Sequence, residues 1–164
     1  MKHFLIILTV LSASVAVTSF TSCGSDDPET EVPNPNPNPD PDPQPPVTGN
    51  KGNIRIGSTT FTVTFQDNET ASAFKQRLPM TINMSELNNN EKFFNLPNAL
   101  PTNASNPGTI QNGDLMLYGS STLVLFYKSF STSYSYTRIG RIDNPSGLES
   151  ALGNGSVSVT IEMQ

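Results

Sequence analysis

From Lys51 to the end of the chain, hydrophobic and polar residues alternate in short runs bounded by turn residues. Strict alternation of this kind is typical of strands that bury one face. Two such runs open the region on either side of a Gly-Ser-Thr turn, and their apolar positions are Ile54, Ile56, Phe61, Val63 and Phe65. The pattern predicts an antiparallel hairpin at the start of the region.

Later apolar runs predict further strands, over residues 80–84, 115–118, 123–128, 138–142 and 157–161. The second and third of these runs flank a Gly-Ser-Ser turn and therefore form a second hairpin. Residues 85–113 are polar, contain many asparagines and several prolines, and show little regular signal. Residues 129–135 form a serine-rich segment with two aromatic residues, which we interpret as a loop.

Two short helices are expected among these strands. Asp67, Asn68 and Glu69 favour a helix start, since capping accounts for all three residues better than a calcium loop does. This helix places Ala71, Phe74 and Leu78 on one side and ends before Pro79.

In the second helix, Asn144 is the expected cap, Pro145 takes the first position and Gly153 ends the helix. Leu148, Ala151 and Leu152 face inward. Two short helices among about eight strands predict a mainly β fold, a closed barrel with a helix over each end.

The first 22 residues have the layout of a secretory signal peptide. Lys2 and His3 precede a short apolar core over residues 4–11, and small residues follow up to Cys23. The core is too short to favour a membrane-spanning helix. A lone cysteine in a secreted chain is compatible with a free thiol or an intermolecular disulfide. However, the segment Phe20-Thr-Ser-Cys23 resembles a bacterial lipobox, and this resemblance implies that Cys23 carries the lipid anchor.

Residues 23–50 are expected to be an acidic tether. Nine of the 14 prolines fall between residues 28 and 46, alternating with Asn and Asp. Proline favours extended polyproline II structure, and about 20 such residues span roughly 60 Å. The segment Gly24-Ser-Asp-Asp27 resembles the export tag of Bacteroidetes surface lipoproteins, which implies an outer-membrane, cell-surface location. A solvated acidic linker is the alternative interpretation.

Charge is divided unevenly along the chain. The net charge of −5 arises in the tether, because residues 51–164 contain eight basic and eight acidic residues. A near-neutral domain lacks the positive surface that nucleic-acid binding requires, so we expect no nucleic-acid partner. The expected partners are the membrane, through the lipid, and a peptide or small-molecule ligand.

Residues 51–164 lack the side chains that several kinds of catalytic and metal chemistry require. The single histidine, His3, belongs to the signal peptide, and the single cysteine is Cys23. Histidine-dependent nucleophilic catalysis and nitrogen–sulfur zinc sites are therefore excluded. Phosphate-binding glycine motifs are also absent from the sequence. We expect no cofactor and no metal.

Several segments resemble the cyclophilins. "DNETASAFKQRLP" (67–79) is similar to the first cyclophilin helix region, and "YTRIGRIDNPSGLESALGNGSVSVTIE" (136–162) resembles the end of the cyclophilin barrel. "MSELNNNEKFFNLPNALPT", "GDLMLYG", "LVLFYKSFSTSYSYTRIGRID" and "ALGNGSV" are similar to a bacterial cyclophilin-like family without a settled activity. The resemblance covers nearly all of residues 51–163 and implies a cyclophilin-like barrel over residues 51–164.

The resemblance does not extend to the isomerase residues. Cyclophilins place an arginine against the proline nitrogen, from a Phe-His-Arg-Ile-Ile-Pro segment. The comparable segment here, "EKFFNLPNAL" (91–100), contains Lys92 and no arginine. The primary hypothesis is therefore a non-catalytic binding module. The alternative is a divergent prolyl isomerase in which Arg138 or Lys92 replaces the missing arginine.

Aromatic residues provide the candidate ligand-binding positions, because binding pockets favour aromatic walls with a few polar groups. The segment 129–138 is the strongest single candidate. A structural role is the alternative, with Phe126 in the core and the tyrosines supporting a loop. The complete candidate set is Lys92, Tyr118, Phe126, Tyr134, Tyr136 and Arg138.

Overall fold

The computed structural model describes residues 49–164. The predicted signal peptide (1–22), the lipidation site Cys23 and nearly all of the predicted tether (23–50) lie outside the described residues. Within the described part, the first strand begins at Lys51.

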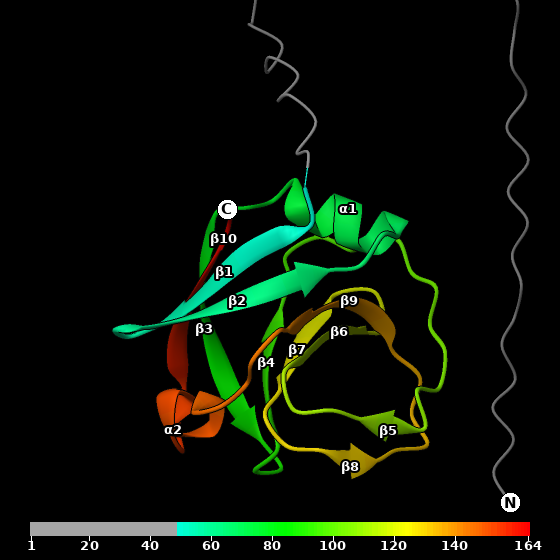
Figure 1. The fold of residues 1–164 in the computed structure, drawn as a ribbon. Helices are drawn as coiled ribbons and strands as arrows, with labels where there is room; N and C mark the ends of the chain where they lie inside the picture. Colours follow the sequence, from blue (N-terminus) through cyan, green and yellow to red (C-terminus); the bar gives the residue numbers. More distant parts are fainter. Residues whose placement is uncertain (1–48) are drawn as a thin grey trace, which may run out of the picture. The chain divides into compact units, whose positions relative to one another are not determined.

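Eight antiparallel strands close into a barrel, in the order β1-β10-β3-β4-β7-β6-β9-β2 (Figure 1). Closure pairs both edges of every barrel strand, so the barrel leaves no open sheet edge. The predicted mainly β, closed barrel is confirmed. Its strands are β1 (Lys51–Ile56), β2 (Thr59–Phe65), β3 (Met80–Leu87), β4 (Glu91–Asn95), β6 (Asp114–Tyr118), β7 (Thr122–Phe126), β9 (Thr137–Ile142) and β10 (Val157–Met163).

A second, two-stranded sheet lies beside the barrel (Figure 1). It pairs β5 (Thr109–Ile110) with β8 (Phe130–Ser131) in antiparallel register. Both predicted hairpins are present, as β1–β2 and β6–β7. The segment 129–135, expected to be a loop, contains β8.

The two helices lie near opposite ends of the barrel in Figure 1. Helix α1 (Glu69–Lys75) begins as predicted, because the Asn68 side chain accepts a hydrogen bond from the backbone N–H of Ala71 at 2.8 Å. Helix α2 (Leu148–Leu152) is shorter than expected. Its cap is Gly147 and not Asn144, whose side chain instead accepts from the N–H of Ser146 in the preceding turn.

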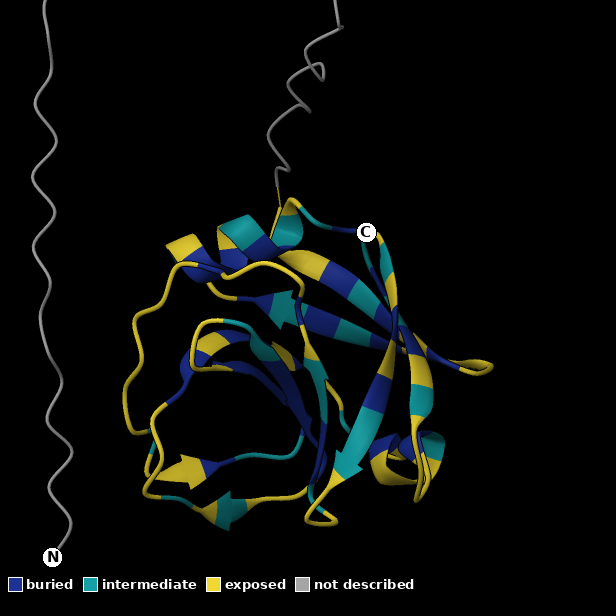
Figure 2. Cartoon of the chain, turned by 180° about the vertical axis from the view of Figure 1, so that it is seen from behind, coloured by how far each residue is buried: buried dark blue, intermediate teal, exposed yellow. Residues whose placement is uncertain are grey.

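The main core fills the inside of the barrel. It combines inward-facing strand residues with Ala71 and Phe74 of α1 and with Leu148 and Leu152 of α2. Figure 2 shows these buried segments in dark blue along the barrel strands, with exposed residues concentrated in turns and loops. A barrel that closes on itself around its own core has the properties of a domain that folds alone.

A smaller apolar cluster lies on the other face of β6 and β7. It contains Ile110, Met116, Val124, Phe126 and Tyr136, with Phe93 and Phe130 packed against it. Both faces of β7 are therefore buried, one inside the barrel and one under the segment that carries β5 and β8. This second cluster forms the base of the candidate site.

The region 85–113 contains more regular structure than the sequence suggested. Strand β3 extends to Leu87, and β4 occupies Glu91–Asn95. The turn between them places Asn88 and Asn89 at φ values of 58° and 54°. Asparagine tolerates this left-handed conformation better than most residues, which explains the asparagine-rich segment.

Candidate functional site

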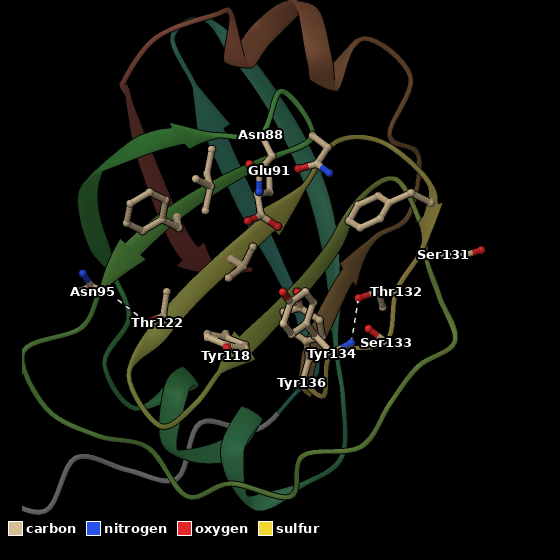
Figure 3. A pocket seen from close by; sticks show the side chains of 15 residues that line it. Asn88, Glu91, Asn95, Tyr118, Thr122, Ser131, Thr132, Ser133, Tyr134 and Tyr136 are labelled. Atoms are coloured by element: carbon tan, nitrogen blue, oxygen red, sulfur yellow. Dashed lines mark hydrogen bonds between the residues drawn. The ribbon is translucent and has the colours of Figure 1, made fainter.

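A pocket of about 570 Å³ opens on the outer face of the barrel, over β4, β7 and β6 (Figure 3). Successive strand residues point to opposite faces, so the odd-numbered residues of β4 reach this face while Lys92 and Phe94 point inward. The cross-strand rows are Phe93–Val124–Met116 and Asn95–Thr122–Tyr118. The opposite wall comes from Phe130 and the segment 131–136. The volume is within the range of small-molecule sites.

Three tyrosines form one wall of the pocket. The Tyr118 ring contacts Tyr134 at 6.2 Å and Tyr136 at 5.6 Å between centroids. Tyr118 and Tyr134 are 47% and 61% exposed, whereas Tyr136 is only 8% exposed. Figure 3 shows the three side chains gathered on one side of the cavity. Large exposed aromatic rings beside a cavity are available for ligand contacts.

Tyr136 is fixed in place from two directions. Its backbone N–H and C=O exchange hydrogen bonds of 3.0 Å with Ser105, which ties the residue before β9 to the long loop that crosses this face. Its ring packs edge-on against Phe126 at 5.4 Å. Burial, followed by the nearby charge of Glu91, raises the pKa of the Tyr136 phenol, so this hydroxyl remains a hydrogen-bond donor at neutral pH.

Glu91 is the carboxylate of the pocket. The residue is 9% exposed and lines the cavity from the start of β4, with its carboxylate directed into the cavity in Figure 3. Burial, with a smaller effect from the charge of Glu86, raises its pKa. Within residues 49–164, the structure gives this carboxylate no hydrogen-bond donor and no ion-pair partner.

Lys92 lies on the opposite side of β4 from the pocket and does not join the other candidates. Its side chain is fully buried inside the barrel, where the ammonium donates to Glu86, to the Gly153 carbonyl at 2.8 Å and to the Gly155 carbonyl at 2.7 Å. These contacts connect β4 to the glycine turn after α2. The alternation of the strand assigns Lys92 a structural position, since the residues on either side of it face the pocket.

Glu86 and Tyr127 complete this internal network. Tyr127 donates its hydroxyl to Glu86 at 2.8 Å, and its ring lies 5.6 Å from the Lys92 nitrogen. Burial opposes ionisation of Glu86, but the hydrogen bonds from Lys92 and Tyr127 outweigh it and lower the Glu86 pKa. Burial and the hydrogen bond to Glu86 raise the pKa of Tyr127. The three residues form a satisfied network.

Arg138 is also outside the pocket lining. Its guanidinium lies 3.7 Å from the buried carboxylate of Asp114, as does that of Arg141. Phe126 is fully buried below the pocket, in contact with Phe130 and Tyr136. Of the six sequence candidates, the structure therefore brings together Tyr118, Tyr134 and Tyr136 around the cavity.

Sequence reasoning missed two of the residues that shape the pocket, Glu91 and Phe93. Both belong to β4, which lies in the region that showed no regular signal. Because Glu91, Lys92, Phe93 and Phe94 are all buried or half-buried, β4 lacks the alternation that marks a one-sided strand. The signal that could have located it is the Asn88-Asn89 pair, because asparagine tolerates the positive φ values that a tight hairpin turn requires.

Residues 49–164 contain neither a metal-binding cluster nor a membrane-spanning helix. No group of three or more His, Cys, Asp or Glu side chains is arranged to hold a metal ion within this range. No helix in the same range has the length and apolar character needed to cross a membrane.

The geometry defines a closed eight-stranded barrel with a ligand-sized pocket on its outer face. The model of the cyclophilin-like family matches residues 54–162, and the chain belongs to this family. The solution structure of a hypothetical protein from Archaeoglobus fulgidus is similar at 21% identity and a TM-score of 0.55. The similarity covers 71% of this chain and 95% of the archaeal one, and it shows a shared fold. No curated protein matches the sequence.

Proposed function

We propose that this cyclophilin-like domain is a non-catalytic binding module whose outer pocket takes a peptide or small ligand. The observation that carries the proposal is the composition of the pocket: five aromatic side chains and one buried carboxylate, with neutral amides and hydroxyls between them. A cavity of about 570 Å³ with these walls matches the size and chemistry of small-ligand sites.

The position of the cations argues for binding over isomerisation. An arginine that stabilises a twisted proline must reach the proline nitrogen in the transition state. Among the described residues, none that lines the pocket is a lysine or an arginine. The Lys92 ammonium is hydrogen-bonded to the Gly153 and Gly155 carbonyls inside the barrel, and the Arg138 guanidinium lies 3.7 Å from the Asp114 carboxylate. This arrangement supports a binding role.

The proposal includes a membrane tether, which rests on the sequence. Residues 1–22 are a secretory signal peptide, Cys23 receives the lipid and residues 24–50 hold the domain away from the membrane. The acidic segment after Cys23 supports an outer-membrane location, with the domain at the cell surface or on the periplasmic face. More than one acyl chain on one cysteine provides stable anchoring.

Nuclear magnetic resonance on a soluble chain from Gly24 to Gln164 tests the binding role. The isotopically labelled protein is titrated with the peptide Gly-Ala-Pro-Ala and with a fragment library, and the cis–trans exchange rate of the peptide is measured in parallel. We expect shift changes at Tyr118, Val124 and Tyr136 with at least one probe, and no acceleration of exchange. Loss of these changes in Tyr134→Ala would confirm the pocket, because that exposed side chain contributes little to the core.

Two results would contradict this function. Faster proline exchange that is lost in Arg138→Ala would establish an isomerase with a rebuilt site. Shift changes confined to residues outside the pocket, with every probe, would remove the basis for assigning ligand binding to this face.

A further inference from the structure

Glu91 is buried without a compensating group, and this sets it apart from the other buried charges. Lys92 donates to Glu86 and to two backbone carbonyls. Asp114 accepts from the N–H of Gln111 at 2.8 Å through Oδ2, and its Oδ1, which has no hydrogen bond within residues 49–164, still has the Arg141 guanidinium at 3.7 Å; Arg138 lies at the same distance from Oδ2. Glu91, at 9% exposure, has no such donor or cation within residues 49–164. A buried charge of this kind is costly unless a partner is supplied.

The pocket around Glu91 has the electrostatic character of a cation site. Glu91 is the one carboxylate among its lining residues, and the described lining contains no lysine, arginine or histidine. The faces of the Tyr118, Tyr134 and Tyr136 rings carry negative electrostatic potential, which attracts cations. The aromatic wall and the carboxylate therefore both favour a positively charged ligand.

Neutral acceptors in the pocket lining suit a group with several N–H donors. Asn88 and Asn95 line the cavity, and Asn95 presents its amide oxygen beside Thr122, which donates to it at 2.9 Å. The amide oxygen of Asn90 is buried and has no donor in the described part of the chain. An ammonium or guanidinium carries three to five donors and no acceptor, which complements this set.

We infer that the ligand of the outer pocket carries an alkylammonium or guanidinium group, which forms a charge-assisted hydrogen bond with the Glu91 carboxylate. This inference rests on the proposed binding function and adds the charge and donor chemistry of the ligand. An anionic ligand would meet a like charge at Glu91. A neutral ligand without donors would bury the carboxylate further and leave it unpaired.

Matched peptides that differ mainly in charge test this inference. The probes are acetyl-Gly-Lys-Gly-amide against its norleucine isostere, and acetyl-Gly-Arg-Gly-amide against its citrulline isostere, each titrated into the labelled chain from Gly24 to Gln164. We expect the lysine and arginine peptides to bind at least about tenfold more tightly than their neutral partners, as charge-assisted hydrogen bonds allow. The shift changes are expected at Glu91, Phe93 and Tyr118.

Two variants assign the effect to Glu91. Glu91→Gln keeps the side-chain shape and removes the charge, so the preference for the cationic peptides is expected to fall to less than about twofold. Glu162→Gln removes one charge on β10, which lies across the barrel from β6, and should leave the preference unchanged. The thermal unfolding midpoint of each variant shows that it is folded.

The outcomes separate this inference from the proposed function. Equal binding of charged and neutral peptides in the pocket would overturn the cation inference and leave the binding module intact. A cation preference that persists in Glu91→Gln would overturn the role of this carboxylate. If fragments bind in the pocket and none of the peptides does, the cationic group is not presented on a peptide. Titration with n-butylammonium then tests a free amine, and failure of this probe to bind as well would overturn the cation inference. An absence of pocket shifts with every probe and fragment would contradict the function itself.

Discussion

Replacing Lys92 with methionine tests whether the internal network holds β4 to the turn after α2. The substitution keeps the apolar length of the side chain and removes the ammonium that contacts Glu86, Gly153 and Gly155. The two glycines are exposed, so water can solvate their carbonyl groups in the variant. Glu86, only 19% exposed in its side chain, loses its charged donor and retains the hydroxyl of Tyr127 and the backbone N–H of Asn89.

The expected cost of this substitution is large for a single residue. Removing one partner of a buried ion pair typically costs about 3–5 kcal/mol. Because Glu86 keeps the Tyr127 hydrogen bond and some contact with water, we expect a value near the lower end, about 3 kcal/mol. For a domain of this size, that loss lowers the unfolding midpoint by roughly 10–15 °C. Urea unfolding at pH 7 measures the free energy directly.

The pH dependence of this cost distinguishes the ion pair from general packing. In the wild type the Glu86 pKa is lowered from 4.5 in the folded state, so its stabilising effect is present above pH 4.5. That effect is lost as the pH falls through the folded pKa. The difference between Lys92→Met and wild type should therefore shrink below about pH 4.5. A packing defect would show no such change.

Two further variants complete the test. Glu86→Gln combined with Lys92→Met gives a double-mutant cycle, in which we expect the double variant to be more stable than the sum of the single losses predicts. Lys128→Met removes the same charge from an exposed pair with Glu149 and should cost less than about 1 kcal/mol. A loss below 1 kcal/mol for Lys92→Met at pH 7 would refute the role assigned to the network.

Three other predictions concern Glu91, Gly52 and Cys23. Glu91→Gln should raise the unfolding midpoint at pH 7 and have little effect at pH 3. The folded-state pKa of Glu91 is raised, so the wild-type protein loses stability as the pH rises from 4.5 through that pKa. Thermal melts of both proteins across this pH range measure the effect. Gly52→Ala should destabilise the barrel strongly, since its Cβ would lie 2.6 Å from the Glu162 carbonyl oxygen, whereas Gly155→Ala meets no atom within 4 Å and serves as the matched control in calorimetry. Cys23→Ser should move the full-length chain from the membrane fraction to the soluble fraction, and retention in the membrane would contradict lipid anchoring at this residue.

The sequence predicted most of the barrel because most of its strands bury a single face. The alternation at Ile54, Ile56, Phe61 and Val63 places all four side chains in the core, and the structure confirms it. The cap of α1 was also predictable, since Asn68 has a local side-chain acceptor at the required position. Gly147 replaces Asn144 as the cap of α2, and the polar turn before this helix concealed its start.

The candidate site was only partly predictable, because its residues become neighbours through long-range pairing. Tyr118, Tyr134 and Tyr136 were identified by residue type, and their contact depends on the β6–β9 pairing and the β5–β8 segment. Lys92 was assigned to the ligand site by its charge. Its side chain points into the barrel, and this could not be predicted because the sequence did not show which residues of β4 face inward.

The adjacent residues Glu91 and Lys92 are both buried and charged, but only the Lys92 side chain has hydrogen-bond partners within the described fold. They are adjacent in β4, and both are at least nine-tenths buried, but they point to opposite faces of the barrel. The inward charge of Lys92 is matched by a carboxylate, two carbonyls and an aromatic ring. The outward charge of Glu91 has no donor or cation partner in the described chain, although the pocket beside it has room for such a group.

This contrast is the reason for treating Glu91 as a functional residue and Lys92 as a structural one. Local departures from the rules of burial are expected where a protein binds something, since the missing group is then supplied by the ligand. If Glu91 served the fold, its removal would lower stability. We expect the opposite, a more stable protein that no longer discriminates cationic from neutral peptides, and this combination distinguishes a binding residue from a core residue.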